Sequence, residues 1–200
     1  MKSSTGRFFR AVAVAFRNGA QSFRDYYERE HDPLTRDALT SAFNRPAFER
    51  RRKKLYSYAL LLLDIDNFKQ INDSYGHSKG DVVLRAVGSS LRIDSGDRVF
   101  RIGGEEFAVL LAGCSAEDAV RVAQRLCDKV RSLDLLDSRA VTVSVGVAWA
   151  GDPTEHDETF KRADQALYLA KRSGKGRVAR FDRRRARLRL VEAGSVRQAA

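Results

Sequence analysis

An apolar run closed by an aspartate constrains this chain more than any other feature. Residues 58–65 read Tyr-Ala-Leu-Leu-Leu-Leu-Asp-Ile, and Asp66 follows directly. A continuous apolar run of this kind is typical of a strand buried on both faces of a sheet. Polar groups at the end of a buried strand are costly unless they have partners. The run therefore predicts a central strand that presents Asp64 and Asp66 at its carboxyl end.

Helical and strand patterns alternate after this run. Apolar spacing predicts helices over 45–55, 68–75, 81–91, 119–130 and 160–170, with a turn at Gly76–Gly80. Strands are expected over 98–102, 107–111, 141–147 and 178–181. Gly103-Gly104 separates the first two of these strands, which predicts a hairpin closed by a tight turn.

The first 36 residues predict a helix of their own. Its apolar positions follow a heptad seam, made of Phe9, Val12, Phe16, Gly19, Phe23 and Tyr26. Arginines lie off the seam, at positions 7, 10, 17 and 24. Two interpretations stay open: a dimerising helix, or a basic amphipathic helix that rests on anionic lipid.

The net charge of +11 is concentrated at the two ends of the chain. Residues 1–36 and the Arg-rich tail 183–200 together carry eight of the eleven excess charges. The central part is nearly balanced, which argues against specific nucleic-acid binding. The basic ends leave weak contact with an anionic membrane as an alternative, and the tail is expected to be a frayed helix or disordered.

Cysteines and apolar runs predict a cytoplasmic protein. Cys114 and Cys127 match no zinc or redox motif, and two thiols cannot make a disulfide framework. Apart from the central strand, the longest apolar run is Ala11–Phe16, far short of the roughly 20 residues of a membrane span. We therefore expect neither a membrane span nor a signal peptide.

Carboxylates flank the predicted hairpin turn and the end of the central strand. If the hairpin lies beside that strand, Asp64 and Glu105 converge, and they would repel one another unless a cation lay between them. Oxygen ligands of this kind select Mg²⁺, usually together with substrate phosphates. Gly103-Gly104 would let the backbone approach a bulky charged ligand. The pattern favours metal-assisted phosphoryl or nucleotidyl transfer over an acidic turn exposed to solvent.

Six blocks of the sequence resemble the GGDEF family of diguanylate cyclases, in its GGEEF form. They are 37–40 with 44–45, 64–73, 75–77 with 80–81, 101–107 (Arg-Ile-Gly-Gly-Glu-Glu-Phe), 144–147 and 163–171. The blocks keep the family's order and spacing from about Asp37 to Asp182, so they are far more specific together than any one alone.

The resemblance implies an α+β fold over residues 37–182. This is a ferredoxin-like palm domain, as in nucleotide cyclases and polymerase palms, with a central, mainly antiparallel sheet flanked by helices. It also implies an enzyme that condenses two GTP into cyclic di-GMP and two pyrophosphates, as a homodimer, in bacterial second-messenger signalling. The alternative is a catalytically silent module that binds GTP or cyclic di-GMP.

The family's functional residues map onto matching positions here. Glu105 is the implied catalytic residue, which activates the 3′-hydroxyl, and it also holds Mg²⁺ (or Mn²⁺) with Asp64, the Ile65 carbonyl and Glu106. Asn72 and Asp81 are implied to hydrogen-bond the guanine. The other implied substrate contacts are His77 and, around the triphosphate, Phe68, Lys69, Lys171 and Lys175.

Two positions depart from the family's pattern. Asp94, in Asp94-Ser95-Gly96-Asp97, stands where many members have the arginine of an inhibitory product site. An acidic residue there would repel the phosphates of a cyclic dinucleotide, so we expect no feedback through this motif. Gly176 stands where asparagine is common. No sensor domain is visible in the sequence, so the input signal is not identified.

Overall fold

The structure, a computed structural model, describes residues 35–92, 98–137 and 139–192. The expected N-terminal helix and the Asp94–Asp97 motif lie outside these residues. The chain divides after Arg36 into two compact units, and the elements below all belong to the second. In the described ranges, no helix has both the length and the apolar character of a membrane span.

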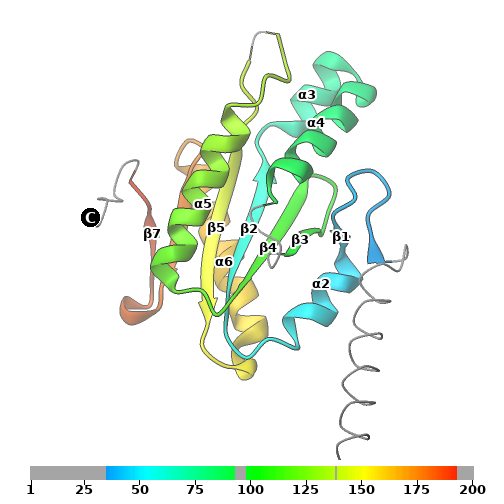
Figure 1. Ribbon diagram of the computed structural model, residues 1–200. Coiled ribbons are helices and arrows are strands. Elements are labelled where there is room, and N and C mark those ends of the chain that lie inside the picture. Colours follow the sequence, from blue (N-terminus) through cyan, green and yellow to red (C-terminus); the bar gives the residue numbers. More distant parts are fainter. Residues whose placement is uncertain (1–34, 93–97, 138, 193–200) are drawn as a thin grey trace, which may run out of the picture. The chain divides into compact units, whose positions relative to one another are not determined.

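A seven-stranded sheet forms the centre of the second unit (Figure 1). Its strands lie in the order β1 (Phe43–Asn44), β3 (Arg98–Arg101), β4 (Glu106–Ala112), β2 (Tyr58–Ile65), β5 (Val143–Ala150), β6 (Val178–Asp182) and β7 (Arg187–Leu190). The β1–β3 and β5–β6 pairs are parallel, and the other four pairs are antiparallel. The expected α+β palm fold with a mainly antiparallel sheet is confirmed.

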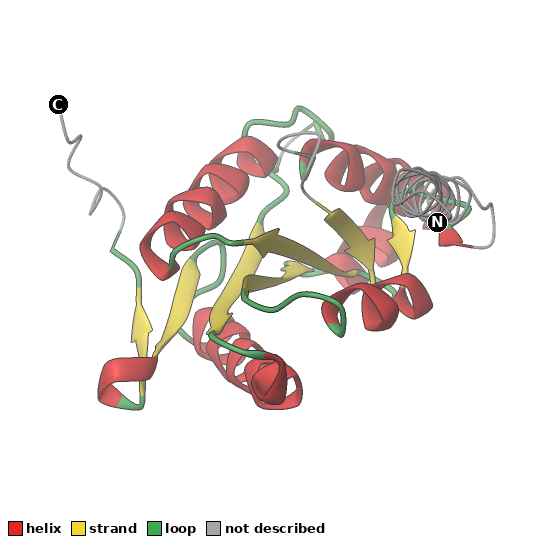
Figure 2. Cartoon of the chain, turned by 60° about the horizontal axis from the view of Figure 1, so that its bottom comes forward, coloured by secondary structure: helices red, strands yellow, loops and turns green. Residues whose placement is uncertain are grey.

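Helices cover both faces of this sheet (Figure 2). Leu61 and Leu63 of β2 belong to the core shared with α3 (Phe68–Tyr75), α4 (His77–Ser90) and α5 (Ala116–Arg131). Leu60 and Leu62 face the opposite core, which contains α2 (Arg45–Arg52) and α6 (His156–Arg172). All eight residues of β2 are buried, as the continuous apolar run predicts.

The described residues correct three expectations. Gly76–Gly80 is no extended turn, because Gly76 alone separates α3 from α4 and Gly80 lies inside α4. The strand expected over 141–147 is β5, which begins at Val143 and runs to Ala150.

The tail is the third correction. Residues 183–190 are not a frayed helix or disordered: a 3-10 turn (Arg183–Arg185) leads into β7, which pairs antiparallel with β6. Leu188 packs on the small apolar residues of α6 and β6, which stabilises the strand.

Candidate active site

The two aspartates at the end of β2 have different surroundings. Asp66 is 3% exposed and accepts three hydrogen bonds, from Thr142 Oγ1, Ser144 Oγ and the Gly176 N–H, at 2.7, 2.7 and 2.8 Å. Asp64 is 7% exposed, and its Oδ2 lies 2.7 Å from Lys171 Nζ of α6. The hydrogen bonds of Asp66 suit a structural role, whereas Asp64 keeps oxygen atoms for a further ligand.

The β3–β4 hairpin lies beside β2, as the convergence of carboxylates requires. Asp64 pairs with Glu106 in the β2–β4 register, and the Ile65 N–H donates to the Glu105 carbonyl oxygen at 3.3 Å. Burial raises the pKa of Glu105, and the neighbouring Asp64 and Glu106 charges raise it further. Burial also raises the pKa of Asp64, which the Lys171 ammonium opposes. The end of β2 and the hairpin turn therefore form one electrostatic site.

These oxygen donors fit a divalent cation. Across the described residues, no cluster of three or more His, Cys, Asp or Glu side chains could hold a metal ion. Asp64 and Glu105 nevertheless provide one buried and one half-buried carboxylate, and burial disfavours the charged form of both. Mg²⁺ is usually held by one or two carboxylates together with substrate phosphates. Glu106 is exposed, and its side chain lies against Gly103.

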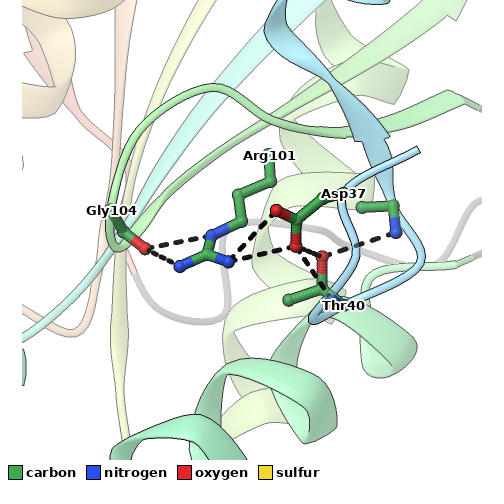
Figure 3. A network of polar contacts seen from close by, with 5 residues as sticks. Asp37, Thr40, Arg101 and Gly104 are labelled. Carbon is green, nitrogen blue, oxygen red and sulfur yellow. Dashed lines mark hydrogen bonds and ion pairs between the residues drawn. The ribbon is translucent and has the colours of Figure 1, made fainter. Parts of the chain in front are cut away.

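Arg101 connects the glycine turn to the first residue of the second unit (Figure 3). Its Nε and Nη2 donate to the Gly104 carbonyl oxygen at 3.1 and 2.7 Å, and its Nη1 lies 3.0 Å from Asp37 Oδ1. The same Asp37 oxygen accepts from the N–H and the hydroxyl of Thr40. Burial would raise the pKa of Asp37, but the bonds from Thr40 and Arg101 outweigh it and hold the pKa below its usual value. Arg101 thus fixes the turn that carries Glu105.

The α3–α4 pair lies at the same end of β2 as the hairpin turn (Figure 1). Asn72 and Asp81 are half-buried there, Phe68 is buried in the core, and Lys69 and His77 are exposed. A Cβ on Gly80 would lie 1.9 Å from Asn72 Oδ1 and 3.3 Å from Phe68 Cζ. The Asn72 side-chain amide therefore occupies the space that a Cβ at position 80 would fill, so its position depends on the glycine.

A Gly80→Ala substitution tests that arrangement. If Asn72 hydrogen-bonds the guanine, as the resemblance implies, the added methyl group should displace its side chain and raise the KM for GTP by about tenfold or more, because a site built to hydrogen-bond its substrate loses affinity when a partner moves. Gly76→Ala offers no control, since Gly76 has φ +82°, so Val82→Ala at an exposed position of the same helix serves instead. An unchanged KM in Gly80→Ala would show that Asn72 does not read the base.

Lys175 lies beyond the end of α6 and reaches the start of α3. Its Nζ is 2.5 Å from Oδ1 of Asn67, and both residues have left-handed backbone, with φ of +62° and +58°. The structure thus brings Lys171 to Asp64 and Lys175 to the β2–α3 turn.

Four of these residues have contacts that the sequence does not indicate. Asp37, Asn67 and Arg101 lie inside the motifs without an implied role, and position in the sequence does not distinguish Asp66 from Asp64. A signal existed only for Asn67, because asparagine tolerates left-handed backbone better than most residues. The other roles depend on partners that are distant in the sequence.

A mainly antiparallel sheet with paired carboxylates at a glycine-turn hairpin defines a palm-type domain. The family described as "Diguanylate cyclase, GGDEF domain" matches residues 31–177, and the chain belongs to this family. The match ends before β6, so β6 and β7 lie beyond it.

Curated relatives share the central part of the chain. It is 42% identical over 158 residues to the uncharacterized protein YhcK of Bacillus subtilis, covering 71% of this chain and 44% of YhcK. It is 41% identical over 152 residues to the diguanylate cyclase DgcM of Escherichia coli, covering 71% of this chain and 37% of DgcM. The chain therefore spans less than half the length of either relative.

Solved structures show the same fold. The diguanylate cyclase SiaD of Pseudomonas aeruginosa, in complex with its activator SiaC, matches with a TM-score of 0.72 at 34% identity, over 86% of this chain and 71% of SiaD. The coiled coil and GGDEF domain of Caulobacter crescentus DgcB, in complex with c-di-GMP, matches with a TM-score of 0.70 at 30% identity, over 86% of this chain and 98% of that one.

Proposed function

We propose that this chain is a diguanylate cyclase that condenses two GTP into cyclic di-GMP. In each half of the reaction, a 3′-hydroxyl oxygen bonds to the α-phosphorus of the other GTP, the hydroxyl loses its proton, and pyrophosphate leaves with the electron pair of the broken P–O bond. The observation that carries the proposal is that, in this GGDEF-family domain, the glycine turn with Glu105 lies beside the end of β2 with Asp64. The hydrogen bond from the Ile65 N–H to the Glu105 carbonyl oxygen joins the two.

The carboxylates would hold the metal and receive the proton. Asp64, Glu105 and the Ile65 carbonyl would bind Mg²⁺ or Mn²⁺, with Glu106 as an additional ligand. The ion supplies charge stabilisation at the phosphates when it is bound. Glu105 is the proposed acceptor for the 3′-hydroxyl proton, because its carboxylate lies at the glycine turn beside the end of β2.

The substrate would lie between the hairpin turn and the α3–α4 pair. Asn72 and Asp81 would read the guanine, and a carboxylate can accept from both its N1–H and its exocyclic amine. Lys171 and Lys175 would bind the triphosphate as point charges. The remaining proposed contacts are Phe68, Lys69 and His77. We place this reaction in the cytoplasm, where free thiols such as Cys114 and Cys127 stay reduced.

Two loaded domains must face each other, so the proposed enzyme is a homodimer. The heptad seam of residues 1–36 lies outside the described residues, and its role stays a prediction. DgcB offers a parallel, since its solved structure comprises a coiled coil and a GGDEF domain.

The seam can be tested in the full chain. Phe16→Glu with Phe23→Glu should leave GTP binding unchanged but lower the activity per chain at nanomolar protein by about tenfold or more, because the seam raises the effective concentration of the two half-sites. Arg17→Glu changes an off-seam charge and is the matched control. Equal activity of all three proteins at nanomolar concentration would exclude the seam, and loss of liposome binding in Arg17→Glu would favour the lipid interpretation.

The alternative is a silent module that binds GTP or cyclic di-GMP. Both central carboxylates are present here, and a GGEEF domain of Vibrio cholerae, 31% identical with a TM-score of 0.55, is described as active. Incubation with GTP and Mg²⁺, followed by measurement of released pyrophosphate, separates the two. A cyclase releases pyrophosphate over many turnovers, whereas GTP binding without release would support the silent module.

A further inference from the structure

The loop after α6 holds an unusual backbone conformation. Gly174, Lys175 and Gly176, which we name the Lys175 loop, have φ angles of +111°, +62° and +57°. A lysine in left-handed backbone is uncommon, and such conformations persist only where the surroundings over-determine them. The contacts of this loop therefore show what fixes it.

Asp66 holds the loop from the sheet side. Its buried carboxylate accepts from Thr142, which directly precedes β5, from Ser144 of β5 and from the N–H of Gly176. Hydrogen bonds to a carboxylate are stronger than neutral ones. One carboxylate thus joins the end of β2, the start of β5 and the Lys175 loop.

Two arginines hold the loop from its other side. Arg131, at the end of α5, donates from Nη2 to the Gly176 carbonyl oxygen at 2.7 Å. Arg177 donates from Nε to the Lys175 carbonyl oxygen at 3.0 Å. Gly176 is therefore bound on both sides of its backbone, by Asp66 at the N–H and by Arg131 at the carbonyl.

The Lys175 side chain extends from this fixed backbone to the start of α3. Its Nζ reaches Asn67 Oδ1 there. A lysine side chain is flexible, so a point charge at a defined place needs a fixed backbone.

We propose that Asp66 and Arg131 are positioning residues that act through Gly176 to hold Lys175 toward the triphosphate of the bound nucleotide. The inference rests on the proposed function, because it needs a nucleotide triphosphate in this site. Neither residue touches substrate in this account. Arg131 lies outside every family motif noted above, and Asp66 lies inside one without an assigned role.

Binding measurements separate positioning from simple structural support. The probes are 3′-deoxy-GTP, which lacks the attacking hydroxyl, and 3′-deoxyguanosine, which lacks the triphosphate. Calorimetry with the full chain and Mg²⁺ would compare Arg131→Met, Lys175→Met, the double variant and Asp66→Asn. Arg125→Met, on the same helix and exposed, is the matched control.

Arg131→Met should weaken 3′-deoxy-GTP binding by about fivefold and leave 3′-deoxyguanosine binding unchanged. The double variant should bind 3′-deoxy-GTP no more weakly than Lys175→Met does, because both changes remove the same interaction of Lys175 with the triphosphate. Arg131 is about half exposed, so its replacement should not unfold the domain even if Asp66→Asn does.

Three results would overturn this inference without touching the proposed function. Two of them are 3′-deoxy-GTP binding that Arg131→Met leaves unchanged and additive losses in the double variant. Equal weakening of both probes would show structural support only and would also overturn it. If the unmutated protein bound no 3′-deoxy-GTP, the proposed function would fail, and this inference with it.

Discussion

Glu105→Gln should lower cyclic di-GMP formation by about 10²–10⁴-fold, the range that a positioned general base contributes. The change is nearly isosteric and keeps the backbone bond from the Ile65 N–H to the residue 105 carbonyl oxygen. It removes one of the two carboxylates that the end of β2 and the glycine turn bring to this site. Activity should therefore be lost without loss of the fold.

The stability of the same variant has a predictable sign. The folded-state pKa of Glu105 is raised, mainly by burial and then by the Asp64 charge, so its ionised form is disfavoured in the folded state at neutral pH. Replacing it with a neutral amide should leave the melting temperature unchanged or higher at pH 7, and the difference should shrink as the pH falls toward the ordinary glutamate pKa. Glu117→Gln, an exposed position on α5 at 4.0 Å from Arg180, should leave activity unchanged and lower the free energy of unfolding by less than about 1 kcal/mol. Normal turnover in Glu105→Gln would remove the role given to this residue.

Gly146→Ala should destabilise the domain by about 3 kcal/mol, the upper part of the range for overpacking a core. A Cβ at Gly146 of β5 would lie 2.1 Å from the Ala163 carbonyl oxygen and 2.3 Å from the Leu167 nitrogen. Both are backbone atoms of α6, so no side-chain rotation can relieve the clash. The whole helix would have to move away from the sheet.

Urea unfolding of Gly146→Ala measures this cost. Gly104→Ala is the matched control for stability, because a Cβ there meets nothing within 4 Å. It should change the free energy of unfolding by less than about 0.5 kcal/mol. Equal stability of Gly146→Ala and the unmutated protein would contradict the close packing of α6 on β5.

Local patterns predicted much of the fold. The bounds of β2 and α3 agree with the expected 58–65 and 68–75. Both elements show a local pattern in consecutive residues: a continuous apolar run for β2 and helical spacing for α3. The start of α4 was missed because Gly80 indicates a turn by itself, whereas here it makes room for Asn72. The alternation of Arg and Leu over 187–190 fits a strand, but β7 forms only because β6 is there to pair with it.

In the candidate site, too, local features could be predicted from the sequence and features that depend on distant partners could not. Asp64 and Glu105 could be proposed as neighbours because one ends a strand and the other closes a hairpin. The different roles of Asp64 and Asp66 could not be predicted, since both end the same strand and only Thr142, Ser144 and Gly176 distinguish them. Arg101 and Asp37 are 64 positions apart, and no pattern along the chain joins them.

The central claim is that this domain joins two GTP through the Asp64–Glu105 site. The most direct measurement is incubation of the full chain with GTP and Mg²⁺, with the product identified by mass and the pyrophosphate counted. We expect cyclic di-GMP, two pyrophosphates for each molecule formed, and no cyclic dinucleotide from ATP alone. Release of GDP and inorganic phosphate, or the same product yield from Glu105→Gln, would contradict the account.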